Sequence, residues 1–216
     1  VIGLFASVLR ERGHTVSMFD STGYDFEGKA DSNVEEEKNL FNAPIDAASS
    51  KGIIKKLTNM YDDFVNKVEE FQPTLIAMTV TESTFMRGIK LIDHLRFKKK
   101  YNILTIVGGV FATFSPERVI REDAVDIVCI GEGEEPLVEI CERLEKSKNI
   151  LRIANLWVKK KDGTIVKNNP GPAVDINLLP IIDFTIFEDD RFYRPMRGKV
   201  YRMLPIETHR GCPYTC

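Results

Sequence analysis

The chain has 216 residues, of which 43% are hydrophobic and 29% are charged, and its formal net charge is -2 at pH 7. This composition is typical of a globular protein with one large domain, or one domain and appendages. The near-neutral charge argues against an electrostatic grip on nucleic acid, which needs a clustered positive surface. No apolar run approaches the roughly 18 residues of a membrane span, and the first residues lack the features of a signal peptide. We therefore expect a cytoplasmic protein with no nucleic-acid partner.

Helices and strands alternate along the first two thirds of the chain. Apolar residues at helical spacing predict helices, and short runs that are almost continuously apolar predict strands covered on both faces. The predicted elements are, in chain order, a helix over 2–13, a strand over 14–20, a helix over 53–71, a strand over 73–80, a helix over 84–99, a strand over 102–109, a short helix over 116–123, a strand over 125–131 and a helix over 135–147. This order predicts an α/β fold with a doubly wound, open parallel sheet of the Rossmann-like or flavodoxin-like kind. Because the first helix has no strand before it, we expect that the first strand is missing.

The pattern changes after residue 149. Two strand-like runs flank Asp162 and Gly163, a pair of residues typical of a tight hairpin turn. A proline-rich stretch over 170–184 predicts a linker, and residues 199–208 are strand-like. We therefore expect an α/β domain over 1–149, a hairpin and linker over 150–180, and a linker with the start of a second, truncated domain over 181–216.

Four cysteines fall into two kinds. Cys129 lies in a predicted buried strand and Cys141 on the apolar face of a predicted helix, so both are interpreted as small core residues. Cys212 and Cys216 follow a strand-like run, with three residues between them. Zinc ribbons and thioredoxin-like sites favour two intervening residues, and two thiolates do not complete a four-coordinate site.

The stretch "RGCPYTC" around these two cysteines resembles the radical SAM superfamily. In that family the motif C-x3-C-x2-C follows the first strand of a partial β/α barrel. Cys212 and Cys216 match the first two cysteines, and the third would fall at position 219, beyond the end of this sequence. The resemblance implies that three thiolates hold a 4Fe-4S cluster, which leaves one iron for S-adenosylmethionine.

The preceding region resembles the cobalamin-binding domain that stands before the barrel in one subgroup of that superfamily. The shared runs are "LRERGHTVSMFD", "PTLIAMTV", "IVGGVFATFSPE", "VDIVCIGEGE" and "LPIIDF". The resemblance implies a full-length enzyme that uses cobalamin, a 4Fe-4S cluster and S-adenosylmethionine, most commonly a methyltransferase. The part of it given by this sequence is expected to be inactive alone.

Candidate cofactor contacts follow three predicted strands, because ligands of an open α/β sheet bind beyond the carboxyl ends of its strands. Glycine has no Cβ, so a ligand can approach its backbone closely. For Gly109, which ends one of these predicted strands, we expect that Gly109→Val blocks binding while the fold survives. By resemblance, Thr79 and Ser83 match hydroxyls that contact the nucleotide tail of cobalamin. Alternatively, the glycines only form turns and the hydroxyls only cap a helix. The candidates are Thr79, Thr81, Ser83, Gly108, Gly109 and Gly131.

The remaining acidic residues and the histidines are not interpreted as cofactor ligands. Acidic residues of the stretch "GEGEE", residues 131–135, are expected to face the dipole of the helix that follows rather than to act as ligands. None of the three histidines is a convincing cobalt ligand.

Two other functions stay open. One is a receiver-like or flavodoxin-like module that binds a partner or small ligand, although Asp20 alone does not form the acidic cluster of a receiver. The other is a radical SAM protein whose first domain has lost cobalamin. The sequence leaves the substrate and the axial ligand of the cobalt undetermined.

Overall fold

The structure is a computed structural model that describes residues 1–24, 56–99, 101–196 and 199–211. The chain forms two compact units. The first consists of Val1–Phe19, Met60–Val174 and Pro180–Asp183, and the second of Asp20–Asn59, Asp175–Leu179 and Phe184–Cys216. The domain boundaries expected from the sequence stay a prediction.

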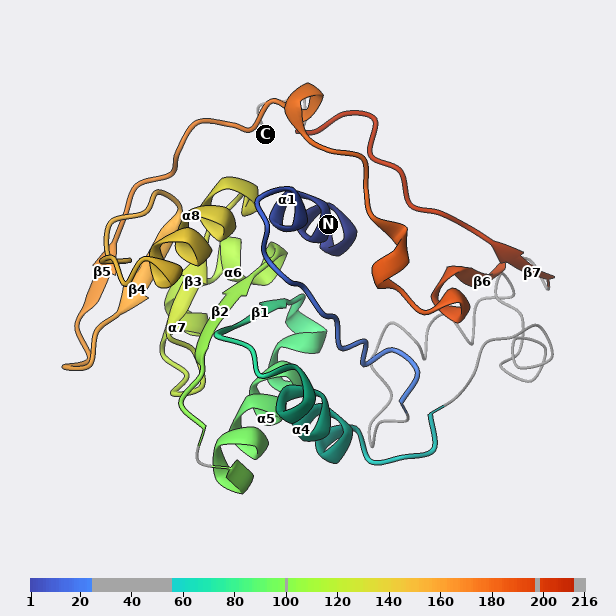
Figure 1. The fold of residues 1–216 in the computed structure, drawn as a ribbon, viewed down its shortest axis with the longest axis horizontal. Coiled ribbons are helices and arrows are strands. Elements are labelled where there is room, and N and C mark those ends of the chain that lie inside the picture. The colour runs from blue at the N-terminus through green and yellow to red at the C-terminus, as the bar shows by residue number, and fades with distance from the viewer. Residues whose placement is uncertain (25–55, 100, 197–198, 212–216) are drawn as a thin grey trace. The chain divides into compact units, whose positions relative to one another are not determined.

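The sheet of the first unit has the strand order β1-β2-β3-β4-β5 (Figure 1). The strands β1 (Leu75–Thr79), β2 (Leu104–Gly108) and β3 (Ile127–Cys129) are parallel. The predicted hairpin of β4 (Leu156–Lys159) and β5 (Ile165–Lys167) adds to the β3 edge with antiparallel pairing. The predicted α/β fold with an open, mainly parallel sheet is therefore confirmed. The sequence did not predict that the hairpin would extend this sheet.

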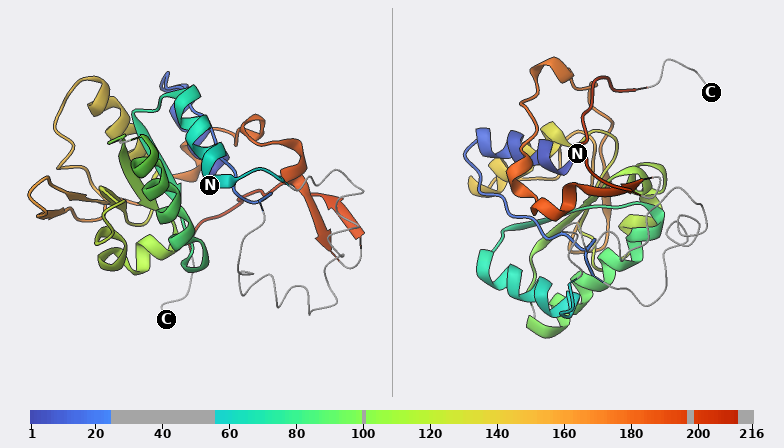
Figure 2. Two further views of the ribbon diagram at one scale, coloured as in Figure 1. Left: turned by 90° about the horizontal axis from the view of Figure 1, so that it is seen from below. Right: turned by 90° about the vertical axis from the view of Figure 1, so that its right-hand side faces the viewer.

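Helices cover both faces of the sheet (Figures 1 and 2). Helix α1 packs against α8, and α4 packs against α5, which also contacts α6. These helices are α1 (Ile2–Glu11), α4 (Met60–Phe71), α5 (Glu82–Lys99), α6 (Val110–Phe114), α7 (Pro116–Ile120) and α8 (Glu134–Glu145). None of the helices in the described part of the chain is long and apolar enough to cross a membrane.

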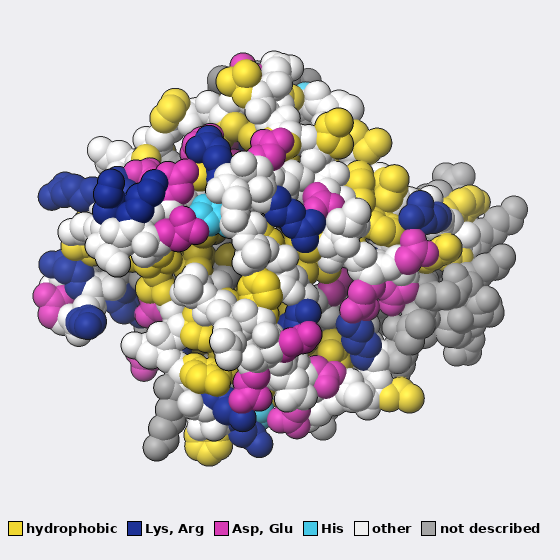
Figure 3. Space-filling model, viewed as in Figure 1, with side chains coloured by type: hydrophobic (Ala, Val, Ile, Leu, Met, Phe, Trp, Pro, Cys, Tyr) yellow, Lys and Arg dark blue, Asp and Glu magenta, His cyan; other side chains and the backbone are white. Residues whose placement is uncertain are grey.

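Burial follows the position of each strand in the sheet. All three residues of β3 are buried, because β3 has neighbours on both edges and helices on both faces. In β1, which lies at one edge, Ala77 and Thr79 are exposed. On α8, Arg143 pairs with Glu139 and Lys146 with Glu142, each one turn away. Positive and negative side chains are interspersed on the face of the molecule drawn in Figure 3.

Two predicted elements differ from the structure. Residues 14–20 form no strand, because a strand needs a hydrogen-bonded neighbour and no described strand pairs with them. The predicted helix over 53–71 begins only at Met60, and its first three residues lie outside the described part of the chain. Leu57 lies within that predicted helix but is 92% exposed and precedes the observed one.

The second unit contains a hairpin of β6 (Tyr193–Met196) and β7 (Lys199–Arg202). The predicted strand over 199–208 therefore ends at Arg202, and the described residues after it carry no strand pairing. Before the hairpin, the ring of Phe192 lies 5.9 Å from the rings of both Phe184 and Phe187. This aromatic cluster gives the second unit a small apolar core.

Candidate functional site

The six predicted cofactor contacts lie along one edge of the sheet in the first unit. Thr79 ends β1 and pairs with Gly108, which ends β2. Gly131 follows the end of β3 by two residues. Because the carboxyl ends of parallel strands meet at one edge, Thr81, Ser83 and Gly109 also lie there. We call the turns after β1, β2 and β3 the carboxyl edge. The contact of these residues with a cofactor stays a prediction.

Gly109 is required by the fold itself. Its φ of 97° lies in the left-handed region that favours glycine. A Cβ at this position would lie 2.7 Å from the carbonyl oxygen of Val80 and 2.8 Å from Oγ1 of Thr79. The backbone N–H of Val80 also donates to the carbonyl of Gly108 over 3.0 Å, which holds the two strand ends together. The expectation that Gly109→Val would spare the fold is therefore wrong, because the valine would collide with the chain before it met any ligand.

The other two glycines leave more room. A Cβ on Gly108 would lie 3.6 Å from Cβ of Cys129, which is an ordinary contact. Gly131 has a φ of 74°, but a Cβ there would meet nothing within 4 Å. The backbone beside Gly131 is therefore open to approach, and Gly108 is the position where an added methyl tests ligand approach with little strain.

The hydroxyl groups after β1 cap helix α5. The backbone N–H of Thr81 donates to Oγ1 of Thr84 over 2.9 Å, in the manner of a capping box. Oγ1 of Thr81 lies 3.1 Å from both Oγ of Ser83 and Oγ1 of Thr84. A hydroxyl oxygen has two acceptor positions, and both Thr81 and Ser83 are exposed. Capping therefore occurs, and it leaves hydrogen-bonding capacity that a ligand can use.

Two side chains that the sequence pattern did not indicate join the turns of the carboxyl edge to their neighbours. Oγ1 of Thr113 donates to the carbonyl of Gly109 and accepts from the N–H of Gly131, each over 3.0 Å. Asn155 is buried, and its amide donates to the carbonyl of Glu132 over 2.7 Å and accepts from the N–H of Gly171 over 2.6 Å. The sequence carried a weak signal for the first, since a helical threonine commonly bonds back to the carbonyl four residues earlier.

The acidic residues after β3 serve the fold. Glu134 and Glu135 lie in the first turn of α8, where negative charge is favourable. Glu132 does something that the sequence did not predict, because its carboxylate accepts the backbone N–H of Val174 over 2.6 Å. This bond and those of Asn155 attach the segment after the β4–β5 hairpin to the turn after β3.

Apolar side chains flank the carboxyl edge. Val110 and Phe114 of α6 are 65% and 82% exposed, and Met86 of α5 is 45% exposed. Helix α6 begins directly after Gly109. These side chains give the edge an apolar border that a large, partly apolar ligand can cover.

The cysteines divide as the sequence predicted, so far as the structure describes them. Burial raises the pKa of Cys129 to about 12, and the charge of Glu134 adds to the effect. Burial also raises the pKa of Cys141 to about 11, with a smaller contribution from Glu145. Both thiols stay neutral at physiological pH; Cys129 lies in the core, whereas Cys141 is only partly buried. Cys212 and Cys216 lie outside the described residues, and the described ones contain no cluster of three or more His, Cys, Asp or Glu that could bind a metal.

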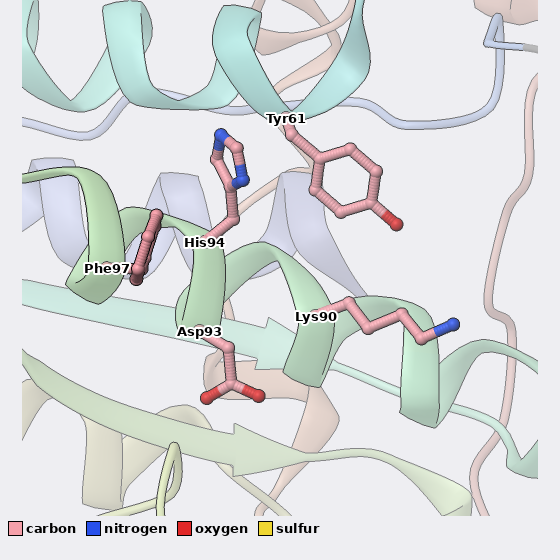
Figure 4. A pocket seen from close by; sticks show the side chains of 5 residues that line it. All are labelled: Tyr61, Lys90, Asp93, His94 and Phe97. Carbon is pink, nitrogen blue, oxygen red and sulfur yellow. The ribbon is translucent and has the colours of Figure 1, made fainter.

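A shallow hollow of about 350 Å³ lies between α4 and α5 (Figure 4). Tyr61 and His94 face each other from the two helices with ring centroids 5.3 Å apart, and Nε2 of His94 lies 3.3 Å from a carboxylate oxygen of Asp62. Its α5 residues, from Lys90 to Phe97, lie in the middle and towards the carboxyl end of that helix. The hollow is therefore remote from the hydroxyls that begin α5 and does not belong to the carboxyl edge.

Comparison with known proteins identifies the region that carries this edge. Residues 41–141 match the family model described as the B12 binding domain. The chain is also 26% identical over 167 residues to an uncharacterized methyltransferase, PH0819, of Pyrococcus horikoshii. That alignment covers 76% of this chain and 35% of the relative, so the chain spans about a third of the relative's length.

Two solved structures share the fold. The radical S-adenosylmethionine methyltransferase TsrM from Kitasatospora setae matches with a TM-score of 0.54 and 13% identity, over 78% of this chain and 26% of that one. The cobalamin-dependent S-adenosylmethionine radical enzyme OxsB matches with a TM-score of 0.51 and 20% identity, over 58% of this chain and 18% of that one. The family match confirms the predicted resemblance to a cobalamin-binding domain, and these two structures show that the fold is shared.

Proposed function

We propose that this chain is the cobalamin-binding region of a radical SAM methyltransferase, and that the carboxyl edge holds the nucleotide tail of the cofactor. The observation that carries the proposal is the B12 binding domain match over residues 41–141, a region that includes β1, β2, β3 and the turns after them. The relative named as a methyltransferase and the fold shared with two radical S-adenosylmethionine enzymes support the wider assignment.

The residues of the carboxyl edge fit such a tail. A nucleotide tail combines a flat base with a polar sugar and phosphate, so it needs close approach for the base and hydrogen bonds for the rest. Gly108 and Gly131 provide small residues at two strand ends, and Thr81 and Ser83 provide exposed hydroxyls at the third. Phe114 and its apolar neighbours stand beside them. The proposed contacts are Thr79, Thr81, Ser83, Gly108, Gly109 and Gly131.

The protein's part in the reaction is to bind and orient its cofactors. Bound cobalamin supplies a methyl group for transfer. In the proposed role, the hydroxyls of Thr81 and Ser83 fix the tail by hydrogen bonds, and the exposed apolar side chains of α6 exclude water from it. Cys212 and Cys216 are proposed as two ligands of a 4Fe-4S cluster that binds S-adenosylmethionine in the full-length protein. The substrate is not part of the proposal.

Cobalamin binding is tested by titrating hydroxocobalamin into the full-length protein and following its absorbance. We expect binding at micromolar concentration, weaker binding of cobinamide, which lacks the nucleotide tail, and reduced affinity in Ser83→Ala and Gly108→Ala. Thr164→Val is the matched control, because it removes a hydroxyl that donates to Asp162 on the β4–β5 hairpin. No spectral change up to about 100 μM, which corresponds to binding weaker than about 5.5 kcal/mol, would overturn the proposal.

The cluster is tested separately by anaerobic reconstitution with iron and sulfide. We expect the wild-type protein to gain the absorbance of one 4Fe-4S cluster and to cleave S-adenosylmethionine, and Cys212→Ala and Cys216→Ala to lose both properties. Cys129→Ala is the control and should retain them, because its thiol is buried and neutral. Full occupancy of the cluster in either of the first two variants would contradict the assignment.

The two tests separate the alternatives. A radical SAM protein whose first domain has lost cobalamin would form the cluster but bind no hydroxocobalamin. A receiver-like module would do neither, and no described observation favours one, since Asp20 forms an ion pair of 2.9 Å with Arg191. The cobalamin-binding reading is therefore the function that the carboxyl edge supports best.

A further inference from the structure

We propose that the hydroxyl of Thr113 is a positioning group for the cofactor site. It holds the turn after β2 and the turn after β3 in one fixed arrangement, so that both present their backbone to the cofactor tail. This inference rests on the proposed function.

The directions of the two hydrogen bonds of Thr113 are unambiguous. A carbonyl oxygen only accepts, so Oγ1 donates its proton to Gly109, and an N–H only donates, so Oγ1 accepts from Gly131. The bond to Gly109 is local, because Thr113 lies in α6 and Gly109, four residues earlier, directly precedes that helix. The bond from Gly131 spans 18 positions of the chain. One hydroxyl therefore joins two separate turns, and we call this pair of bonds the Thr113 bridge.

The two turns depend on the bridge to different degrees. Gly109 is also held by the close packing of its Cα against Val80 and Thr79, where an added Cβ would meet atoms within 3 Å. Gly131 faces open space on the side where a Cβ would stand. Its neighbour Ile130 is fixed by a 2.9 Å bond to the carbonyl of Asn155, and the N–H of Gly131 itself is fixed by Thr113. Loss of the bridge should therefore release the turn after β3 more than the turn after β2.

Releasing this turn should weaken binding more than folding. The N–H of Gly131 lies in an exposed setting, so water can replace the hydroxyl when the protein is empty. Glycine has the largest backbone freedom of any residue, so a released Gly131 must be ordered again when the tail binds. Fixing a loop beforehand raises affinity because that ordering cost is avoided.

The experiment compares Thr113→Val, which keeps the shape but removes the hydroxyl, with Thr113→Ser, which keeps the hydroxyl. Thr113→Ala is the second hydroxyl-free variant, for use if valine disturbs α6. Thr164→Val is the control for loss of a hydroxyl elsewhere. Each full-length protein is titrated with hydroxocobalamin, melted, and examined by amide hydrogen exchange resolved at Gly131.

We expect Thr113→Val and Thr113→Ala to weaken hydroxocobalamin binding about tenfold, the effect of one lost hydrogen bond that orders a binding loop. Exchange at the Gly131 amide should become at least about tenfold faster, whereas amides in the centre of β2 should not change. Thr113→Ser should restore both quantities, and Thr164→Val should alter neither.

Three outcomes would overturn the inference. Equal affinities in Thr113→Ala and wild type would show that the hydroxyl does not position the site. Equal loss in Thr113→Ala and Thr113→Ser would assign the effect to the methyl group. Faster exchange throughout the sheet would indicate general loss of stability. If the wild type itself binds no hydroxocobalamin, the proposed function fails, and exchange at Gly131 still reports separately whether the bridge forms.

Discussion

Different kinds of side chain hold the turns at the two ends of the parallel strands. At the ends opposite the carboxyl edge, which we call the amino edge, charged side chains make hydrogen bonds to the backbone. The carboxylate of Asp126 accepts the N–H of Thr105 over 2.8 Å and lies 3.2 Å from Nη2 of Arg96, and Nζ of Lys159 donates to the carbonyl of Glu122 over 2.8 Å. At the carboxyl edge, the hydroxyls of Thr84 and Thr113 and the amide of Asn155 make the corresponding bonds, and Glu132 adds one charged side chain.

We expect this difference to separate the residues that stabilise the fold from those that bind the cofactor. Long charged side chains fill the space at the amino edge, and burial there lowers the pKa of Lys159. Small uncharged groups make most of the bonds to backbone at the carboxyl edge, and glycines and hydroxyls stay accessible there. The amino edge should therefore tolerate substitution without loss of binding, and the carboxyl edge should lose binding before it loses its fold, except where packing within the chain requires a particular residue.

The largest effect is expected at that exception. Gly109→Ala forces a left-handed backbone on alanine and places a methyl 2.7 Å from the carbonyl oxygen of Val80. We expect a loss of at least about 3 kcal/mol in the free energy of unfolding, measured by urea denaturation. Gly108→Ala is the matched control and should cost less than about 1 kcal/mol, because its methyl makes an ordinary contact. Similar stabilities for the two variants would contradict the packing described at Gly109.

Substitution at the amino edge should have the next largest effect. Asp126→Ala leaves the backbone N–H of Thr105 and the guanidinium of Arg96 without this acceptor. We expect a loss of about 2 kcal/mol in the free energy of unfolding, with hydroxocobalamin affinity unchanged at a temperature where the variant is folded. Lower affinity in the folded variant would show that the two edges are not independent.

A smaller effect is expected from pH. The pKa of Cys129 is raised from 9.0 to about 12 by burial, so the folded protein holds this proton more tightly than the unfolded chain. The contribution to stability is complete below pH 9 and is lost as pH rises from 9 towards 12. By pH 10 the loss should amount to about 1.4 kcal/mol, measured as the difference in pH dependence between the wild type and Cys129→Ala. Parallel stability curves for the two proteins, or rapid labelling of this thiol at pH 8, would contradict its burial.

Local pattern was enough to predict most of the first unit. The apolar runs that became β1, β2 and β3, and the helical spacing of α1, α5 and α8, depend on residues that are neighbours in the sequence. The position of the candidate site followed from the same alternation, because parallel strands bring their carboxyl ends to one edge. The resemblance carried by the stretches around Gly109 and Gly131 then indicated the cofactor.

Only the tertiary structure decided which residues hold that edge together. Residues 14–20 have the composition of a strand, yet strands exist through pairing, and no described strand pairs with them. Gly109 is glycine because Val80, 29 positions earlier, lies against it, and Thr113 matters because Gly131 comes within 3.0 Å of its hydroxyl. Sequence periodicity reports which face of an element is buried. It does not report which distant backbone group will contact a given side chain. At the carboxyl edge, such contacts determine how the turns of the candidate site are arranged.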